Sequence, residues 1–185
     1  MKNNKNKGIS LIETVVTTAI FVVASIIIGS LFVSNSQLYR VQTTVTDIKI
    51  YKTNFSKNFK NIGESASEIV SSWTINGLPY TTSSSTIVFK SPSLDVDNNI
   101  ISNTYDYVVF YKNGDSVFID TEADALSKRI SIKKLLAKEV EGLRFVYNNS
   151  DPTQASTATA IINFQNSDAN RSPLTEIVQL KNKIN

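Results

Sequence analysis

The chain contains no cysteine and no histidine. Thiol nucleophiles, disulfide frameworks and zinc sites built from these two residue types are therefore excluded. The sequence also lacks a G-x-S-x-G turn and a glycine-rich phosphate loop, and without histidine it has no nucleophile–base pair of the usual kind. We therefore expect neither catalysis nor a bound cofactor.

The sequence also lacks a large excess of either positively or negatively charged residues. The 19 Lys+Arg residues face 16 Asp+Glu residues, and the formal net charge is +3. Lys2, Lys5 and Lys7 lie within the first eight residues, and without them the two signs balance. The basic pI therefore belongs to the N-terminus, and we expect no nucleic acid as a partner.

Apolar residues are concentrated in one run, Ile9–Val33, whose only charged residue is Glu13. Because roughly 20 helical residues cross the hydrocarbon core of a bilayer, this run is long enough for a single-pass anchor. The lysines that precede it place the N-terminus in the cytoplasm and the C-terminal part outside. A secretory signal peptide would have an apolar region of roughly 7–15 residues before small residues at a cleavage site, and no such site ends this run.

Glu13 is the unusual residue of this segment. A carboxylate inside an apolar helix costs roughly 2.5–3.5 kcal/mol on insertion scales, and such residues are usually paired or functional. One alternative is that Glu13 lies near the membrane surface and reaches water. A plain signal anchor is another alternative, but it leaves the carboxylate unexplained.

The stretch Lys7–Glu13 (KGISLIE) resembles the prepilin leader and processing motif of type IV pilins and type II secretion pseudopilins. The resemblance covers about the first 30 residues. It implies that a prepilin peptidase cuts after Gly8 and that Ile9 becomes the N-methylated first residue, where the family usually has Phe. Glu13 then matches the glutamate that the family has as its fifth mature residue.

The resemblance also implies how the subunit assembles. Processing creates an ammonium group at Ile9, and the carboxylate of Glu13 in one subunit can pair with the amine of a neighbour. Because both charges are costly in an apolar setting, such a pair specifies axial register more than it adds stability. The implied partners are the prepilin peptidase and other pilins or pseudopilins, bound by helix packing, first in the cytoplasmic (inner) membrane and then in the filament.

A helical period continues beyond the membrane segment, with Lys52 as a polar exception. It predicts one long helix over residues 9–62, whose second half packs on the protein's own sheet, with Gly63 as a stop signal. A second short helix is expected over Glu64–Ser72. The apolar positions of the predicted stripe are Leu38, Val41, Val45, Ile48, Phe55, Phe59 and Ile62.

Beyond residue 80 the period changes to two, which indicates short strands. Asn113-Gly114 predicts a type I′ hairpin turn between strands at Tyr105–Lys112 and Asp115–Asp120. The further expected strands are Thr86–Lys90, one strand in which Ile130 and Ile132 alternate with polar residues, Leu143–Tyr147, Ala158–Phe164 and Thr175–Leu180. We therefore predict an α+β fold, the pilin fold, in which a long N-terminal helix packs on an antiparallel β-sheet.

The predicted organisation has four parts: a basic leader (1–8), a transmembrane and assembly helix (9–34), its amphipathic continuation (35–63) and a β-rich globular domain (64–185). The strand pattern of residues 100–182 is similar to that of J-type minor pseudopilins and W-type minor pilins. The resemblance implies a minor subunit.

Three surface features are candidate sites. The Asp95–Asn99 loop is rich in oxygen ligands for Ca²⁺, but it lacks the EF-hand spacing, and a plain turn is the favoured interpretation. Tyr105, Tyr107 and Tyr111 share one face of a strand, which fits either an exposed contact surface or ordinary sheet packing. The basic cluster comprises Lys128, Arg129, Lys133, Lys134 and Lys138. Apolar residues interleave with it, and a solvated face is favoured over a nucleic-acid site.

Two functions from different classes fit the sequence. One is a structural filament subunit, a minor pilin or pseudopilin. The other is a monomeric, membrane-anchored extracytoplasmic domain for binding or adhesion. Only the first accounts for the basic leader, Gly8 and Glu13 together.

Overall fold

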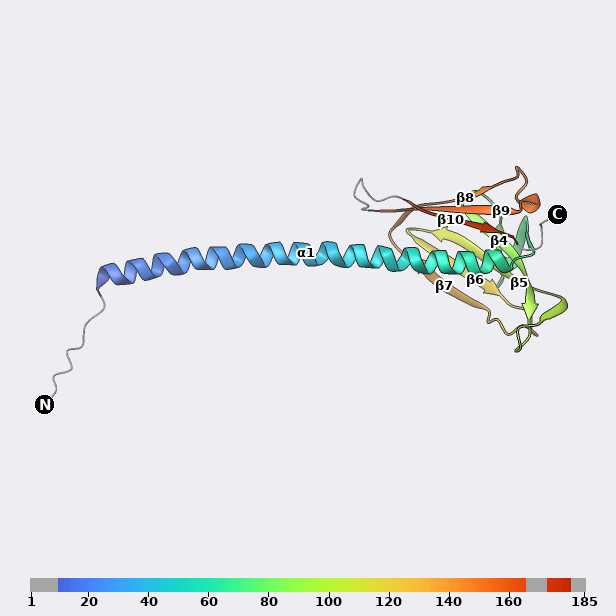
Figure 1. Ribbon diagram of the computed structural model, residues 1–185, viewed down its shortest axis with the longest axis horizontal. Helices are drawn as coiled ribbons and strands as arrows, with labels where there is room; N and C mark the ends of the chain where they lie inside the picture. Colours follow the sequence, from blue (N-terminus) through green and yellow to red (C-terminus); the bar gives the residue numbers. More distant parts are fainter. Residues whose placement is uncertain (1–9, 166–172, 181–185) are drawn as a thin grey trace. The chain divides into compact units, whose positions relative to one another are not determined.

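The computed structural model describes residues 10–165 and 173–180 (Figure 1). The chain divides into two compact units, residues 1–47 and residues 48–185. Helix α1 (Leu11–Ser65) begins in the first unit and ends in the second. Gly8 and Ile9 lie outside the described residues.

In the first unit, every side chain that the structure describes between Leu11 and Asp47 is exposed. The predicted stripe is therefore wrong in its first half, since Leu38 is 59% exposed and Val45 is 40% exposed. The side chain of Val41 is not among those described. The apolar period alone could not reveal this difference, because an apolar face can be covered by the chain's own sheet or by another molecule.

In the second unit, burial on α1 begins at Ile48, and Phe55 and Phe59 are fully buried. The helix continues through Gly63, the predicted stop, to Ser65. The predicted helix over Glu64–Ser72 is wrong: β1 (Glu68–Ile69) and the start of β2 (Ser72–Ile75) occupy this segment. Backbone hydrogen bonds from Ser67 to Lys90 and from Val70 to Val88 draw it onto the sheet, and this pairing overrides a weak helix propensity.

A five-stranded antiparallel sheet in the order β1-β4-β5-β6-β7 forms the main layer of this unit. Its longer strands are β4 (Thr86–Leu94), β5 (Ile100–Asn113), β6 (Ser116–Glu122) and β7 (Ile132–Ala137). The predicted hairpin is confirmed as β5–β6, and the strand predicted at Thr86–Lys90 is confirmed as part of β4. Ile130 lies before β7 and not in a strand.

A second antiparallel sheet has the order β10-β9-β8. It consists of β8 (Val140–Tyr147), β9 (Thr157–Phe164) and β10 (Leu174–Gln179), with a short 3₁₀ helix at Pro152–Gln154. Figure 1 shows these three strands together at one side of the last part of α1. The α+β class, with a long helix packed on antiparallel sheets, is confirmed.

Phenylalanines form the centre of the core between α1 and the two sheets. Phe59 contacts Phe110 edge-to-face at a centroid distance of 5.4 Å and lies 5.8 Å from Phe89 and from Phe145. Aromatic pairs at such distances add about 0.5–1.5 kcal/mol each beyond the area they bury. This cluster fixes the end of α1 against both sheets.

The opposite face of the five-stranded sheet is covered by a hairpin of β2 and β3 (Leu78–Thr81). Its two turn residues, Asn76 and Gly77, have φ angles of 49° and 80°, the two positive angles of a type I′ turn. The turn predicted at Asn113-Gly114 differs, because the loop consists of Gly114 and Asp115 and only Gly114 has a positive φ, 61°. One positive angle at the first loop residue is the pattern of a type II′ turn.

Candidate functional site

The segment Leu11–Val33 of α1 is apolar and exposed around its whole circumference. Among the described residues, α1 is the one helix that is long and apolar enough to cross a membrane. A helix that is apolar on all sides, without a partner in its own chain, is compatible with a single-pass anchor.

Hydroxyl groups in this segment are satisfied by the helix itself. Thr17 donates to the carbonyl oxygen of Glu13 at 2.7 Å, and Thr18 donates to that of Thr14 at 2.8 Å. Ser25 and Ser30 donate in the same way to Phe21 and Ile27. Because these hydroxyls need no water, they lower the cost of placing the helix in an apolar environment.

Glu13 lies in the first turn of α1 with an exposed side chain. Within the described ranges, no residue donates a hydrogen bond or an ion pair to its carboxylate. The unpaired amides of a helix N-terminus favour a negative charge there, but only by about 0.3–1 kcal/mol. This is less than the roughly 2.5–3.5 kcal/mol that it costs to insert a carboxylate into a membrane. In a membrane, a cationic group from another molecule would offset the remaining cost.

A shallow apolar groove follows Glu13 along the helix. It is lined by Thr14, Val15, Thr18, Ala19, Val22 and Val23. Small side chains one turn apart, such as Thr14 and Thr18, allow a second helix to approach closely in a membrane, where van der Waals packing drives association. Because successive helical residues are about 100° apart, these groove residues centre on the side of α1 opposite Glu13, so a helix in the groove and a partner of Glu13 would be two different neighbours.

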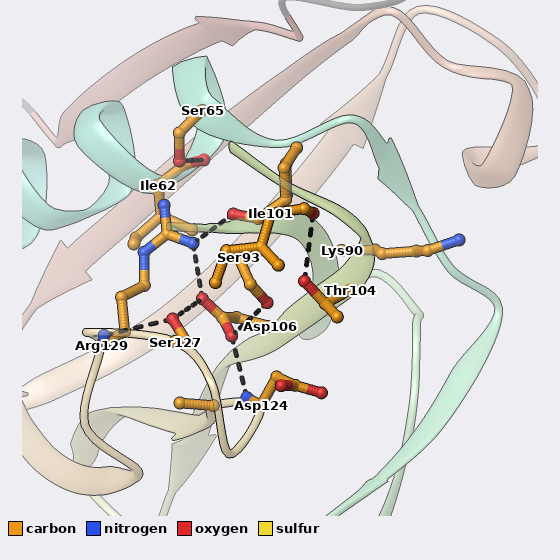
Figure 2. Close-up of polar contacts among 12 residues, drawn as sticks. Ile62, Ser65, Lys90, Ser93, Ile101, Thr104, Asp106, Asp124, Ser127 and Arg129 are labelled. Carbon is orange, nitrogen blue, oxygen red and sulfur yellow. Dashed lines mark hydrogen bonds and ion pairs between the residues drawn. The ribbon is translucent and has the colours of Figure 1, made fainter. Parts of the chain in front are cut away.

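The globular unit contains a buried carboxylate that sequence reasoning did not single out. Asp106 on β5 has no exposed surface, and Figure 2 shows side chains from β4 and from the β6–β7 loop converging on it. Oδ2 accepts a 2.7 Å hydrogen bond from Nη1 of Arg129 and one from Ser127, while Oδ1 accepts from Ser93 and from the backbone amide of Asp124.

The electrostatics of Asp106 follow from these contacts. Burial by itself would raise its pKa, but the hydrogen bonds from Arg129, Asp124, Ser127 and Ser93 outweigh burial and lower the pKa below its usual value. Arg129 also donates to the carbonyl oxygen of Pro92. Because four protein donors hold a carboxylate without exposed surface, the arrangement fits a structural tie between the β6–β7 loop and strands β4 and β5. The sequence contained one indication of this burial. Asp106 lies two and four residues before Val108 and Phe110, so in a strand it shares their buried face.

The predicted basic cluster is divided by the structure. Arg129 is in the buried ion pair, Lys128 bonds to Asn98, and Lys133 lies over the rings of Phe118 and Tyr111 at 5.1 and 5.5 Å. Lys134 and Lys138 are exposed, and no described residue pairs with them. The cluster is therefore not one continuous solvated face.

The oxygen-rich loop forms a local turn. Asp95 accepts hydrogen bonds from the backbone amides of Asp97 and Asn99 at 2.9 and 2.8 Å and from the side chain of Asn99. These are the bonds that the turn interpretation predicts. In the described part of the chain, no three or more acidic side chains gather to hold a metal ion.

The three tyrosines share a face of β5, as predicted, but differ in environment. Tyr107 stacks on Trp73 at a centroid distance of 3.7 Å, and Tyr111 is buried beneath the β2–β3 hairpin beside Tyr80. Tyr105 lies at the rim, with Nζ of Lys90 4.1 Å from its ring centroid. Sheet packing therefore accounts for two of the three.

No protein-family model matches the chain, and no curated protein matches it either.

Proposed function

We propose that this protein is a structural subunit of a type IV pilus or of a filament like that of type II secretion. A prepilin peptidase processes it between Gly8 and Ile9, and it enters the filament through the first part of α1. The observation that carries the proposal is the exposed carboxylate of Glu13 at the start of an exposed apolar helix. The motif Lys7–Glu13 supplies a reason for that carboxylate, namely a bond to the new amine of a neighbouring subunit.

The exposed apolar residues beyond the membrane-length segment support the same proposal. Leu38 and Val45 have no cover in the first unit, and a filament of packed helices would bury them. The alternative function, a monomeric anchored domain for binding or adhesion, leaves both Glu13 and these residues without a role.

The test is N-terminal sequencing of protein extracted from membranes of the producing cell. The proposal requires a mature chain that starts at Ile9, with or without an N-methyl group. A chain that starts at Met1, or one that starts beyond residue 30, would rule out prepilin processing.

Within this function we propose a minor, initiating or tip-proximal subunit. The strand pattern of residues 100–182 resembles J-type and W-type minor subunits, and the large β-rich unit is harder to repeat along a dense lattice. Quantitative mass spectrometry of sheared filaments decides the point. If this chain is the most abundant pilin there, it is a major subunit instead.

A further inference from the structure

Strand β7 is one edge of the five-stranded sheet. It pairs with β6, and within the described ranges no strand pairs with its other side. An edge strand exposes a row of backbone N–H and C=O groups that can pair with an added strand. The opposite edge, β1, has only two residues, so β7 is the longer available edge of this sheet.

The side chains of β7 form a definite pattern. Ile132 and Leu135 are 54% and 37% exposed, although both are large and apolar, and two lysines lie between them. Because successive residues of a strand point to opposite faces, Ile132 and Lys134 share one face and Lys133 and Leu135 share the other. Each face of the edge therefore carries one apolar and one basic residue.

The start of β7 is held in place. The loop before it is tied to the sheet by the ion pair between Arg129 and Asp106 and by a 2.7 Å hydrogen bond from the amide of Lys128 to the carbonyl oxygen of Leu94. A strand whose position is fixed in advance loses less conformational freedom when it binds a partner. The edge is thus pre-organised by contacts that do not themselves touch the added strand.

A second copy of β7 is disfavoured at this edge in the register that would align its apolar residues with those of the first. In the antiparallel register that pairs Ile132 with Leu135 of the other copy, Lys133 would face Lys134, and like charges directly opposite each other are unfavourable. The same lysines would attract a strand with acidic residues at those two positions, so they reject one partner and select another.

We propose that the β7 edge binds an extended segment of a partner protein as a sixth strand, and that this segment has the pattern apolar–acidic–acidic–apolar. Its two apolar residues lie opposite Ile132 and Leu135, and its two acidic residues lie opposite Lys133 and Lys134. The pattern reads the same in both directions, so it fits a parallel or an antiparallel addition. A nucleic acid is less favoured, because most of the basic cluster already contacts other residues of the chain. Only Lys134 and Lys138 have no partner among the described residues.

The test uses the full chain in lipid nanodiscs and a fluorescent peptide of about ten residues with the core Val-Glu-Glu-Val. Anisotropy at physiological salt is expected to show saturable binding, and hydrogen exchange is expected to slow at the amides of β7. Lys134→Glu should weaken binding about tenfold, since it replaces an attraction across the strands by a repulsion. Lys57→Glu, the same charge change at an exposed position on α1, should leave binding unchanged.

Two further probes separate strand addition from simple charge attraction. A peptide with the same charge but with proline in its core lacks a backbone N–H and should not bind. Equal binding of the proline peptide, or no saturable binding of the first peptide, would overturn the proposal. Binding of a DNA duplex that Lys134→Glu abolishes, without peptide binding, would overturn it in favour of a nucleic-acid site.

Discussion

Nη1 of Arg129 lies 2.7 Å from Oδ2 of Asp106, whose side chain has no exposed surface. The side chain of Arg129 is only 18% exposed, so most of this ion pair is removed from water. Ser93, Ser127 and the amide of Asp124 complete the hydrogen bonds of the carboxylate. A buried charge pair of this kind contributes less through its own attraction than through the penalty that follows when one partner is lost.

Replacement of Asp106 by asparagine should therefore destabilise the globular unit strongly. The change leaves Arg129 without its counter-charge, and breaking a buried pair costs about 3–5 kcal/mol. Urea unfolding followed by the fluorescence of Trp73, the single tryptophan, measures the effect. Asp97→Asn in the exposed β4–β5 loop is the matched control and should change the free energy of unfolding by less than about 0.5 kcal/mol. Equal stabilities of the two variants would refute the role of the ion pair.

The same carboxylate makes stability depend on pH in the acid range. The folded state lowers the pKa of Asp106, so its contribution is fully present above the unfolded value of about 3.9 and is lost as pH falls through the lower folded value. The urea concentration at the unfolding midpoint of the wild type should therefore decrease as the pH is lowered below about 4. In Asp106→Asn this part of the acid dependence should be missing, and an identical pH profile would show that another group is responsible.

Gly63 on α1 leaves room for β10. A Cβ atom at this position would lie 2.5 Å from Cγ2 and 2.8 Å from Cβ of Val178, which is itself buried. Gly63→Ala gains about 1 kcal/mol of helix propensity, but overpacking costs about 1–3 kcal/mol, so we expect net destabilisation. In a double-mutant cycle, Val178→Ala should rescue Gly63→Ala by about 1 kcal/mol or more. Gly29→Ala, where nothing lies within 4 Å, should not alter the unfolding of the globular unit.

Deletion of residues 1–35 should leave a soluble, folded α+β domain, because Ile48 is the first of the described side chains of α1 to be buried. Circular dichroism should show a cooperative thermal transition. A longer deletion, of residues 1–60, removes Phe55 and Phe59 from the core and should abolish that transition. A disordered 36–185 fragment would contradict the independence of the globular unit.

Glu13→Ala should insert into the membrane at least as well as the wild type, since the charge costs roughly 2.5–3.5 kcal/mol on insertion scales. Under the proposed function, cleavage survives and incorporation into sheared filaments is lost. Glu13→Gln keeps the size of the side chain and should fail in the same way, because the missing element is the charge. Normal incorporation of either variant, measured by immunoblotting of filaments against membranes, would refute charge pairing.

The sequence by itself determined the class of fold and the presence of one segment long and apolar enough to cross a membrane. A period of 3.6 along α1 and a period of two after residue 80 identify the helix and the strands, because each secondary structure presents its faces at a fixed spacing. The exposed apolar segment around Glu13 could be predicted for the same reason. The β5–β6 hairpin was also predictable, since Asn113-Gly114 is a local turn signal, although the turn itself lies one residue later.

The tertiary structure decided what depends on contacts between distant residues. The segment after Ser65 became β1 because β4 offers it backbone partners, and Gly63 became a packing position because Val178 approaches it. Among the side chains of α1 that the structure describes, Ile48 is the first buried one and marks where the chain's own sheets cover the helix. Asp106 and Arg129 are 23 residues apart in the chain, and their pairing follows from the register of β5 and the path of the β6–β7 loop. The strand register and the loop path cannot be read from a local stretch of sequence, because packing across the sheet sets both of them.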